Sequence, residues 1–394
     1  MTAVSLAPCP DYEFDKIFPA LEACLEPFGG MDQIIPAGAK VLIKINLLND
    51  YPLEYATVTH PLVTKAVIRM VKNAKAIPIV GEQSGPAEKG MTLRAFKNSG
   101  TLDVCLQEGV GISAFNEKGY ESVDCPSNKH LKTLFLAKDV LESDFVIGIA
   151  KVKTHIQTLF TGTIKNYFGC IPLKYRKIAH SLGRYDPVCE AIVDIFHAVQ
   201  PTFTFLDGII GMEGKGPTNG NPKKLGVLLA ARDHVACDTI AMQMIGISPE
   251  RYHVLTDAHS RGLGENRFEK ITLFNGPLNR YHTSFEPPPR FLLNPPGFLA
   301  KITTRLFFEK VWIDPELCRN CGICVKSCPA EAITIDKHAM IDYTRCLECL
   351  CCMELCPHEA VDEKTSAIIK PLRKIKNFLT PRVSLDKSDL NRDS

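Results

Sequence analysis

The 394-residue sequence lacks an excess of charge of either sign, a long hydrophobic run and an N-terminal leader pattern. Lys and Arg number 46 against 44 Asp and Glu, so no overall field would draw the chain to nucleic acid or to a membrane. No window holds the roughly 18 apolar residues that a membrane helix needs, and the N-terminus has no basic segment followed by an apolar one. We therefore expect a cytoplasmic protein with no nucleic-acid partner and no transmembrane segment.

The sequence also lacks a recognisable phosphate or dinucleotide fingerprint. In the glycine-rich stretch DGIIGMEGKGPTNGNP (207–222), Gly214 and Gly216 are followed by Asn219 where a dinucleotide site needs glycine, and no Ser or Thr follows Lys215. The stretch is either a surface loop or a loop whose backbone amides approach a ligand. In the second case, the candidate cofactor-binding residues are Gly211, Glu213, Gly214 and Gly216.

Cysteine, by contrast, is abundant and unevenly placed. Nine of the 16 cysteines lie between Cys318 and Cys356. A chain of this length does not need a disulfide scaffold, so the clustering indicates a metal site. The other seven cysteines are dispersed in mostly apolar contexts and are predicted to be buried free thiols; they are Cys9, Cys24, Cys105, Cys125, Cys170, Cys189 and Cys237.

One motif, Cys-x2-Cys-x2-Cys-x3-Cys-Pro, occurs twice in the cysteine-rich segment, as CRNCGICVKSCP and CLECLCCMELCP. Thiolates are the soft ligands that iron-sulfur clusters require. A zinc site closed by four cysteines is the alternative, but two complete four-cysteine runs that each end in Cys-Pro fit iron-sulfur better. Over about residues 312–362 the segment resembles bacterial two-cluster ferredoxins, including the hairpin-like stretch AITIDKHAMIDY between the two runs.

The spacing predicts two [4Fe-4S] clusters with crossed ligands, because the first three cysteines of a run wrap one cluster and the fourth reaches the other. The first set is Cys318, Cys321, Cys324 and Cys356, and the second is Cys346, Cys349, Cys352 and Cys328. Cys351 is out of register and is expected to be a bystander. Residues 314–362 hold nine Asp or Glu against four Lys or Arg, which is consistent with a low reduction potential.

Residues 40–274 alternate short apolar runs with longer amphipathic ones, as in βα units. We predict a three-layer α/β domain with a mainly parallel sheet over residues 1–275. Strands are expected at 40–48, 76–83, 110–115, 144–151, 203–209 and 225–231, and helices at 61–74, 91–108 and 187–199. A small α+β two-cluster ferredoxin domain is expected at 312–362.

A Pro-rich linker is predicted between these domains, at residues 276–311, and a basic tail at 363–394. Residues 298–312 have helical spacing, and this amphipathic segment would either dock one domain on the other or lie on a membrane surface. The tail holds eight Lys or Arg against four Asp or Glu. A solvated tail is the simpler interpretation, and peripheral membrane contact is the alternative.

Polar side chains follow the predicted strands, at the edge where open α/β sheets bind ligands. Lys44 and Asn46 follow the strand residues KVLI, and Glu82 opens the turn GEQSGP after AIPIV. We expect these three residues to take part in cofactor or ligand binding.

The stretch KVKTHIQTLFTGTIKNYFGC (151–170) places several cationic residues directly after the apolar run FVIGIA. Lys151, Lys153 and, if the strand continues, His155 share one face. An unpaired buried lysine is costly, so an anion should compensate it; a solvated rim of lysines is the alternative. We predict that Lys151, Lys153, His155, Lys165 and Asn166 are catalytic and line one cavity with Lys44 and the glycine-rich stretch.

Several of these segments together resemble a known family. The tripeptide THP (59–61), the stretches 151–169 and 207–222, and DHVACDTIAMQMIG (233–246) are similar to the family catalogued as domain of unknown function 362, whose members are often fused to a two-cluster ferredoxin. The resemblance spans about residues 40–275. The resemblance implies a functional site at these segments and does not identify the reaction.

Three functions are compatible with this sequence. The first is an iron-sulfur oxidoreductase that passes single electrons from two [4Fe-4S] clusters to a small anionic substrate or a redox partner protein, with His155 or a lysine supplying protons. The second is an electron-transfer or cofactor-assembly protein without chemistry of its own. The third is a non-redox enzyme with structural clusters.

Overall fold

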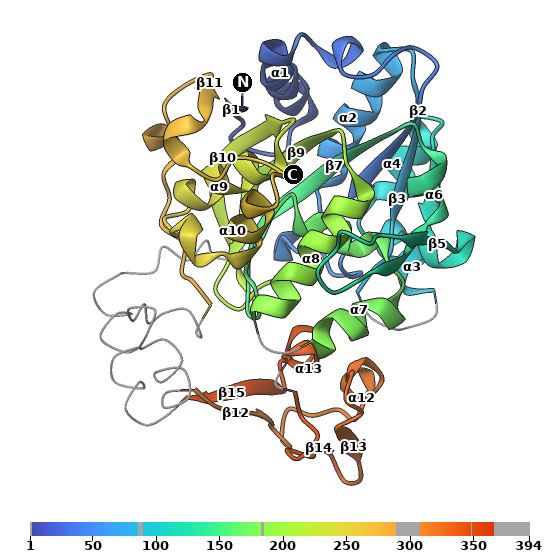
Figure 1. Cartoon of the computed structure of the whole chain (residues 1–394), viewed down its shortest axis with the longest axis vertical. Helices are drawn as coiled ribbons and strands as arrows, with labels where there is room; N and C mark the ends of the chain where they lie inside the picture. Colours follow the sequence, from blue (N-terminus) through green and yellow to red (C-terminus); the bar gives the residue numbers. More distant parts are fainter. Residues whose placement is uncertain (1, 86–89, 183–184, 289–307, 348, 366–394) are drawn as a thin grey trace.

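The computed structural model describes residues 2–85, 90–182, 185–288, 308–347 and 349–365, and its centre is a nine-stranded sheet (Figure 1). The strand order is β11-β1-β10-β9-β7-β2-β3-β4, and β8 pairs with β7. Five strand pairs are parallel and three are antiparallel. The predicted α/β fold with a mainly parallel sheet is confirmed.

The nine strands of the sheet have the following bounds: β1 Ala3–Pro8, β2 Lys40–Ile45, β3 Ile77–Glu82, β4 Gly111–Ala114, β7 Phe145–His155, β8 Leu159–Thr161, β9 Phe203–Glu213, β10 Asn221–Ala231 and β11 Thr272–Phe274. The helices of the same domain are α1 Phe14–Leu25, α2 Pro61–Asn73, α3 Met91–Asn98, α4 Thr101–Gln107, α5 Phe115–Lys118, α6 Lys138–Glu142, α7 Leu173–Ser181, α8 Asp186–Val199, α9 His234–Met244 and α10 His253–Ser260. A separate hairpin pairs β5 Tyr120–Asp124 with β6 Thr133–Ala137.

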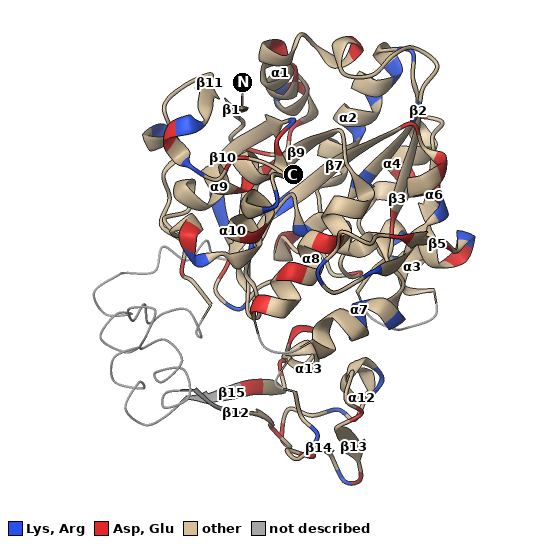
Figure 2. Cartoon of the chain, viewed as in Figure 1, with Lys and Arg blue, Asp and Glu red and all other residues tan. Residues whose placement is uncertain are grey.

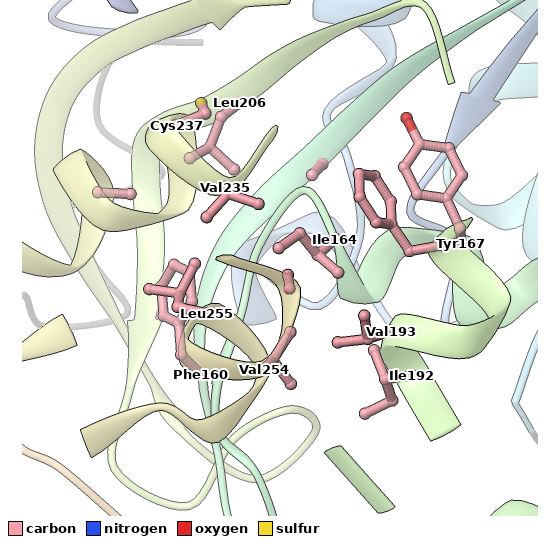
Figure 3. Close-up of a cluster of buried hydrophobic side chains, with 14 of the residues drawn as sticks. Phe160, Ile164, Tyr167, Ile192, Val193, Leu206, Val235, Cys237, Val254 and Leu255 are labelled. Atoms are coloured by element: carbon pink, nitrogen blue, oxygen red, sulfur yellow. The ribbon is translucent and has the colours of Figure 1, made fainter. Parts of the chain in front are cut away.

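Helices cover both faces of the sheet, so the domain has the three layers that the sequence predicts. Apolar side chains of α1 and α2 pack with β2 and β3 in one core. On the other face, α8, α9 and α10 pack in a second core that includes Phe160, Ile164 and Tyr167 from the segment after β7 (Figure 3). The segment with the candidate site residues is therefore anchored in the core by its apolar members.

Several sequence expectations need correction at the level of elements. The helix predicted over 91–108 is two helices, because Gly100 has a φ of +71° and interrupts the α conformation. Strands β9 and β10 form an antiparallel hairpin, where βα repetition alone implies parallel strands. Strand β7 continues to His155, which satisfies the condition for placing His155 on the face of Lys151 and Lys153.

The C-terminal cysteine-rich unit (residues 308–365) is built from two short antiparallel pairs. Strand β12 (Phe308–Ile313) pairs with β15 (Val361–Thr365), and β13 (Ile333–Ile335) pairs with β14 (Ala339–Ile341). The hairpin expected between the two cysteine runs is thus confirmed. The short helices α12 (Ile323–Ser327) and α13 (Cys351–Glu354) each begin inside a cysteine run.

The helix predicted over 298–312 falls mostly outside the described residues. Its last five residues, 308–312, lie in β12 and not in a helix, because they pair with β15. The basic tail beyond residue 365 also lies outside the described residues.

The cysteine-rich unit packs against the α/β domain below α7 (Figure 1). Ile156, at the turn after β7, joins an apolar cluster with Val311, Leu350 and Met353 of the unit. Two polar contacts also join the two parts. Lys215 Nζ lies 2.7 Å from Asp362 Oδ2, and Lys177 donates a hydrogen bond to the Lys326 carbonyl. The two parts of the chain therefore share an interface at the C-terminal ends of the central strands.

The seven dispersed cysteines are all buried free thiols, as predicted. Within the described part of the chain, no helix combines the length and the apolar character that crossing a membrane requires.

Candidate functional site

A cavity of about 100 Å³ lies between the α/β domain and the cysteine-rich unit. Its floor is formed at the C-terminal ends of β2, β3 and β7. Strands β2 and β7 are neighbours in the sheet. From β2 the sheet continues through β3 and β4 on one side, and from β7 it continues through β9 and β10 on the other. Such a topological switch point is where open α/β sheets bind ligands. The residues that line the cavity are Asn46, Leu48, Glu82, Gln83, Gly85, Lys153, Thr161, Lys165, Asn166, Phe168, Gly169, Leu173, Arg176, Lys177, His180, Pro217, Ser327, Cys351, Glu354 and Leu355.

Lys153 of β7 reaches this cavity as a buried cation without a carboxylate partner among the described residues. Its Nζ donates to Asn46 Oδ1 at 2.8 Å and to the Thr57 carbonyl at 2.7 Å. Burial, together with the positive charges of Lys165 and Lys151, lowers the pKa of Lys153 to about 7. Because an ammonium group has three donors, one donor of Lys153 remains for a ligand.

Lys44 lies directly beneath the cavity and is fully satisfied by the protein. Its Nζ donates to Glu82 Oε2 at 2.6 Å, to the Ile45 carbonyl at 2.8 Å and to the Asn166 carbonyl at 2.9 Å. Glu82 and Asn166 line the cavity, whereas Lys44 does not. The Lys44–Glu82 pair therefore holds two cavity residues in place and adds no net charge.

The segment after β8 brings Lys165 and Asn166 into the cavity. It forms the 3-10 helix η4 (Lys165–Cys170). Lys165 makes no hydrogen bond or ion pair with the described residues; its Nζ lies 5.2 Å from the Phe168 ring centroid. Burial lowers the pKa of Lys165. Like Lys153, it is a cation available to a ligand.

Gly169 follows at a position where no side chain fits. A Cβ there would lie 2.0 Å from Glu82 Oε1 and 2.9 Å from Lys44 Nζ. The glycine allows η4 to approach the buried Lys44–Glu82 pair.

Helix α7 supplies cavity residues that sequence reasoning missed. Arg176 is buried, and its guanidinium donates to the carbonyls of Ile171, Gln83, Ser84 and Gly169 but to no described carboxylate. His180, one turn further along, also faces the cavity. Their i, i+4 spacing in RKIAH places both on one helix face, and this was the signal available in the sequence. Figure 2 shows Lys and Arg along α7, the helix nearest to the cysteine-rich unit.

His155 lies behind the cavity wall and contacts the cysteine-rich unit. Its Nδ1 accepts hydrogen bonds from the amides of Gln157 and Thr158, so the neutral ring carries its proton on Nε2. That Nε2 lies 3.5 Å from Glu354 Oε2. Burial lowers the pKa of His155 to about 4, so the ring is neutral at physiological pH.

Lys151 does not line the cavity, and its predicted placement there is corrected. Its Nζ lies 2.8 Å from Asp207 Oδ2 and 2.6 Å from the Tyr12 hydroxyl. The pairing of β7 with β9 shifts register between Lys151 and Lys153. Each of the two lysines thus has its own set of partners, although both are buried on one strand.

The glycine-rich stretch forms the tip of the β9–β10 hairpin and faces the cysteine-rich unit. Of its residues, Pro217 lines the cavity, whereas Gly211, Glu213, Gly214 and Gly216 do not. Glu213 Oε2 instead pairs with Lys223 at 2.8 Å. The tip contacts the unit directly, because Asn219 Nδ2 donates to the Cys356 carbonyl at 3.5 Å. The expectation that these four residues line the cavity is corrected. The hairpin tip instead contacts the cysteine-rich unit at the interface between the two parts.

Helix α9 anchors the segment that carries Lys165. Asp238 accepts hydrogen bonds from the amides of Thr163 at 2.6 Å and Ile164 at 3.1 Å. Gly162 has no Cβ, which would otherwise lie 2.2 Å from Asp238 Oδ1. Burial raises the pKa of Asp238 to about 7. The sequence pattern does not indicate this role for Asp238, because it depends on the contact between α9 and the segment that leads into η4.

Three buried polar atoms around the cavity have no hydrogen-bond partner in the described structure. They are Thr161 Oγ1, His180 Nδ1 and Ser327 Oγ. Their residues are 5%, 8% and 5% exposed, and all three line the cavity. Buried polar groups are normally satisfied by protein or ordered water, so these atoms are available to hydrogen-bond with a polar ligand or with water in the cavity.

The eight predicted cluster ligands surround two further cavities in the cysteine-rich unit. Cys318, Cys321, Cys324 and Cys356 line one, and Cys328, Cys346, Cys349 and Cys352 line the other. These are the two groups of four that the crossed pairing predicts. Each of these groups of four soft sulfur donors suits an iron-sulfur cluster, and the Ala332 amide also donates to Cys328 Sγ at 3.2 Å.

Cys351 lies between the second of these cavities and the cationic cavity. It is 6% exposed and lines both. It precedes Cys352 in α13, and its thiol contacts that of Cys349, which helps to raise its own pKa. The residue that appeared to be a bystander in the sequence thus separates the two sites.

Family models match both parts of the chain. One, described as a domain of unknown function (DUF362), matches residues 41–243, and another, described as a 4Fe-4S dicluster domain, matches residues 310–365. A thylakoid-associated protein from Synechocystis sp. is 31% identical over 269 residues, which cover 68% of this chain and 82% of that protein.

Two solved structures show weaker similarity. The lactate racemase apoprotein from Thermoanaerobacterium thermosaccharolyticum has 15% identity and a TM-score of 0.38, over 57% of this chain and 54% of that chain. A protein from Thermotoga maritima has 12% identity and a TM-score of 0.32, over 58% and 57%. This chain therefore spans little more than half the length of either, and neither similarity bears on its activity.

Proposed function

The chain belongs to the DUF362 family and carries a C-terminal 4Fe-4S dicluster domain, and from this premise we propose that it is an iron-sulfur oxidoreductase. It passes single electrons to a small anionic substrate held in the cationic cavity between its two parts. The observation that supports this most is the position of Cys351, which lines both the cationic cavity and the neighbouring cavity of four cysteines.

The eight cysteines of the two groups hold the clusters in this proposal. One [4Fe-4S] cluster is bound by Cys318, Cys321, Cys324 and Cys356, and the other by Cys328, Cys346, Cys349 and Cys352. When bound, such clusters supply one-electron chemistry. The second group lies next to the substrate cavity, whereas the first includes the exposed Cys321.

The residues of the α/β domain bind and orient the substrate. Lys153 and Lys165 offer ammonium donors, and Arg176 adds a fixed positive charge beside them. Apolar surface from Leu48 and Phe168, together with Leu355 of the cysteine-rich unit, completes the wall. This surface excludes water and strengthens the electrostatic attraction. Fixed donors of this kind favour the reduced substrate, which carries additional negative charge.

Lys153 is also the proton donor in this proposal. Its pKa of about 7 lets Nζ exchange a proton near neutral pH, as general acid-base catalysis requires. Neutral acceptors on Asn46 and Thr57 keep the amine oriented in either protonation state. His155, whose Nε2 faces Glu354, supports the cavity wall.

The proposal is tested by following cluster reoxidation. Anaerobically purified protein is reduced and mixed with a panel of anionic metabolites, and the cluster absorbance is recorded. We expect rapid reoxidation by particular anions and not by neutral analogues. If intact reduced clusters stay reduced with every compound, the oxidoreductase proposal fails and the electron-transfer alternative gains support.

Variants connect the reaction to the cavity. Lys165→Gln removes a cavity cation that has no partner among the described residues. It should raise the substrate concentration needed for half-maximal reoxidation rate by about tenfold or more, without unfolding the domain. Lys174→Gln on the same helix as Arg176 is the matched control, because Lys174 is exposed and does not line the cavity. Equal behaviour of the two variants would contradict the assignment of the cavity.

A further inference from the structure

The charges around the cavity indicate the chemical class of its ligand, and this inference rests on the proposed function. The lining includes three groups that are cationic when protonated, Lys153, Lys165 and Arg176, and the carboxylate of Glu354. Glu82 is offset by its ion pair with Lys44 at 2.6 Å. With both lysines protonated, the net charge of these four groups is +2. Lys177 adds a further, more exposed cation at the rim of the cavity.

The two histidines near the cavity do not change this balance. Burial lowers the pKa of both His155 and His180 to about 4, so both rings are neutral at physiological pH. Glu354 lines the cavity, and its Oε2 lies 3.5 Å from His155 Nε2.

The cations have donors left for a ligand. Two donors of Lys153 go to Asn46 and Thr57, so one remains. Lys165 donates to no described residue and has all three free. Arg176 is different, because four backbone carbonyls accept from its guanidinium; it supplies charge more than hydrogen bonds.

Neutral groups complete the binding surface. The unpartnered atoms Thr161 Oγ1, His180 Nδ1 and Ser327 Oγ come from three separate elements that meet at the cavity. Each residue is more than nine-tenths buried, and an unsatisfied buried polar group costs about 1–3 kcal/mol. A ligand with several acceptor oxygens would satisfy them together with the lysines.

We propose that the cavity binds a compact small molecule with two negative charges, a short dicarboxylate or a phosphate group, and discriminates against monoanions. Two charges match the excess of positive charge, and carboxylate or phosphate oxygens match the donors. The small volume of the cavity, about 100 Å³, restricts the ligand to a few heavy atoms within the wall. Three residues of the cysteine-rich unit close the site; they are Ser327, Glu354 and Leu355.

Binding is expected to take up protons above neutral pH. Lys153 faces Lys151 on β7, Lys165 on η4, Glu82 on β3 and Glu354 on α13, and its pKa is about 7. A bound dianion stabilises the charged amine, so the pKa rises on binding. At about pH 8.5 the free amine is mostly neutral and should gain close to one proton, whereas at about pH 6 it is already charged and should gain almost none.

The experiment measures binding to the oxidised holoprotein by isothermal titration calorimetry under anaerobic conditions. Malonate and inorganic phosphate probe the two dianion chemistries, acetate is the monoanion, and malonamide is the neutral counterpart of malonate. We expect one dianion, or both, to bind at least about tenfold more tightly than acetate and malonamide. Comparable affinity for acetate or malonamide, or no binding of either dianion, would overturn the inference.

Two variants locate the binding. Lys165→Gln should lower dianion affinity by about tenfold or more, while Lys174→Gln should leave it unchanged. Lys153→Met should also reduce the proton uptake measured at about pH 8.5 in buffers of different ionisation enthalpy. Full affinity in Lys165→Gln, or undiminished proton uptake in Lys153→Met, would show that the anion lies elsewhere and overturn the inference.

The two proposals fail in different ways. Dianion binding without any cluster reoxidation contradicts the oxidoreductase function and leaves the binding inference intact. Cluster reoxidation by a monoanion or a neutral compound, with no dianion binding, supports the redox function and overturns the inference about charge.

Discussion

At the scale of single residues, similar lysines have different environments. Lys44 has all three donors taken by protein acceptors, and Lys151 pairs with the Asp207 carboxylate away from the cavity. Lys153 has only neutral acceptors, keeps one free donor and lines the cavity. These differences depend on what surrounds each ammonium group, because sequence spacing sets the direction of a side chain but not its partners. Lys153 is suited to ligand binding because it both keeps an unused donor and lines the cavity.

Gly169→Ala tests how closely η4 must approach the buried ion pair. The new Cβ would lie 2.0 Å from Glu82 Oε1, so the loop or the Lys44–Glu82 pair must move. We expect the free energy of unfolding to fall by about 1–3 kcal/mol, measured by urea denaturation. Gly111→Ala is the control, since Gly111 has no neighbouring atom within 4 Å of the added Cβ; a similar loss in both variants would contradict this account.

Cys351→Ser tests the assignment of the cluster ligands. Because Cys351 is outside the two groups of four, the variant should keep the iron and sulfide content of the wild type. Cys349→Ser should lose iron and change the electron paramagnetic resonance spectrum of the reduced protein. Loss of iron from Cys351→Ser to the same extent as from Cys349→Ser would make Cys351 a ligand and contradict the crossed pairing.

At the scale of elements, α9 positions the cavity segment without touching the cavity. Asp238 accepts hydrogen bonds from the backbone amides of Thr163 and Ile164, the two residues that precede Lys165. The hydrogen bonds fix the start of η4, and the apolar residues Ile164 and Tyr167 hold it in the core. Asp238 is therefore a positioning residue in our proposal.

Asp238→Asn should displace this segment, because the amide NH2 group would meet backbone N–H donors if it replaced one carboxylate oxygen. We expect a loss of about 1–3 kcal/mol in stability together with weaker dianion binding, measured by denaturation and calorimetry. Asp233→Asn is the matched control. Asp233 caps the same helix by accepting the Ala236 amide at 2.9 Å, so its loss should affect stability but not affinity. Weaker binding in both variants to the same degree would assign the effect to general destabilisation.

Helix α7 shows why part of the site escaped prediction. The pattern RKIAH places Arg176 and His180 on one face, but many surface helices have such a pair. Their burial depends on segments far away in the sequence, since Arg176 donates to the carbonyls of Gln83 and Ser84 and shares the cavity with residues of the cysteine-rich unit. The sequence of the helix alone could not distinguish a cavity wall from a solvated face.

At the scale of the whole molecule, the cavity exists because two parts of the chain meet. Ser327, Cys351, Glu354 and Leu355 belong to the cysteine-rich unit, and the cations belong to the α/β domain. A ligand there would contact both parts at once. The packing of Ile156 against Leu350 and Met353 keeps the parts together.

Removal of the clusters should therefore weaken dianion binding. Loss of iron unfolds or loosens small metal-dependent domains, which opens the cavity on one side. We expect the chelator-treated protein to bind the dianion at least about tenfold more weakly, while circular dichroism shows that the α/β domain remains folded. Unchanged affinity in the iron-free protein would show that the cysteine-rich unit does not contribute to the site.

The sequence by itself determined the α/β class, the two cysteine motifs and the strands that end at the site, because these depend on periodicity and on ligand spacing along the chain. It also identified Lys153, Lys165 and Asn166 as neighbours at one strand edge. Only the tertiary structure decided that Lys151 pairs elsewhere, that the glycine-rich hairpin serves the interface, and that Arg176, His180 and Glu354 complete the cavity. The physical reason is that burial and partner choice depend on contacts between segments far apart in the sequence, and local patterns do not record them.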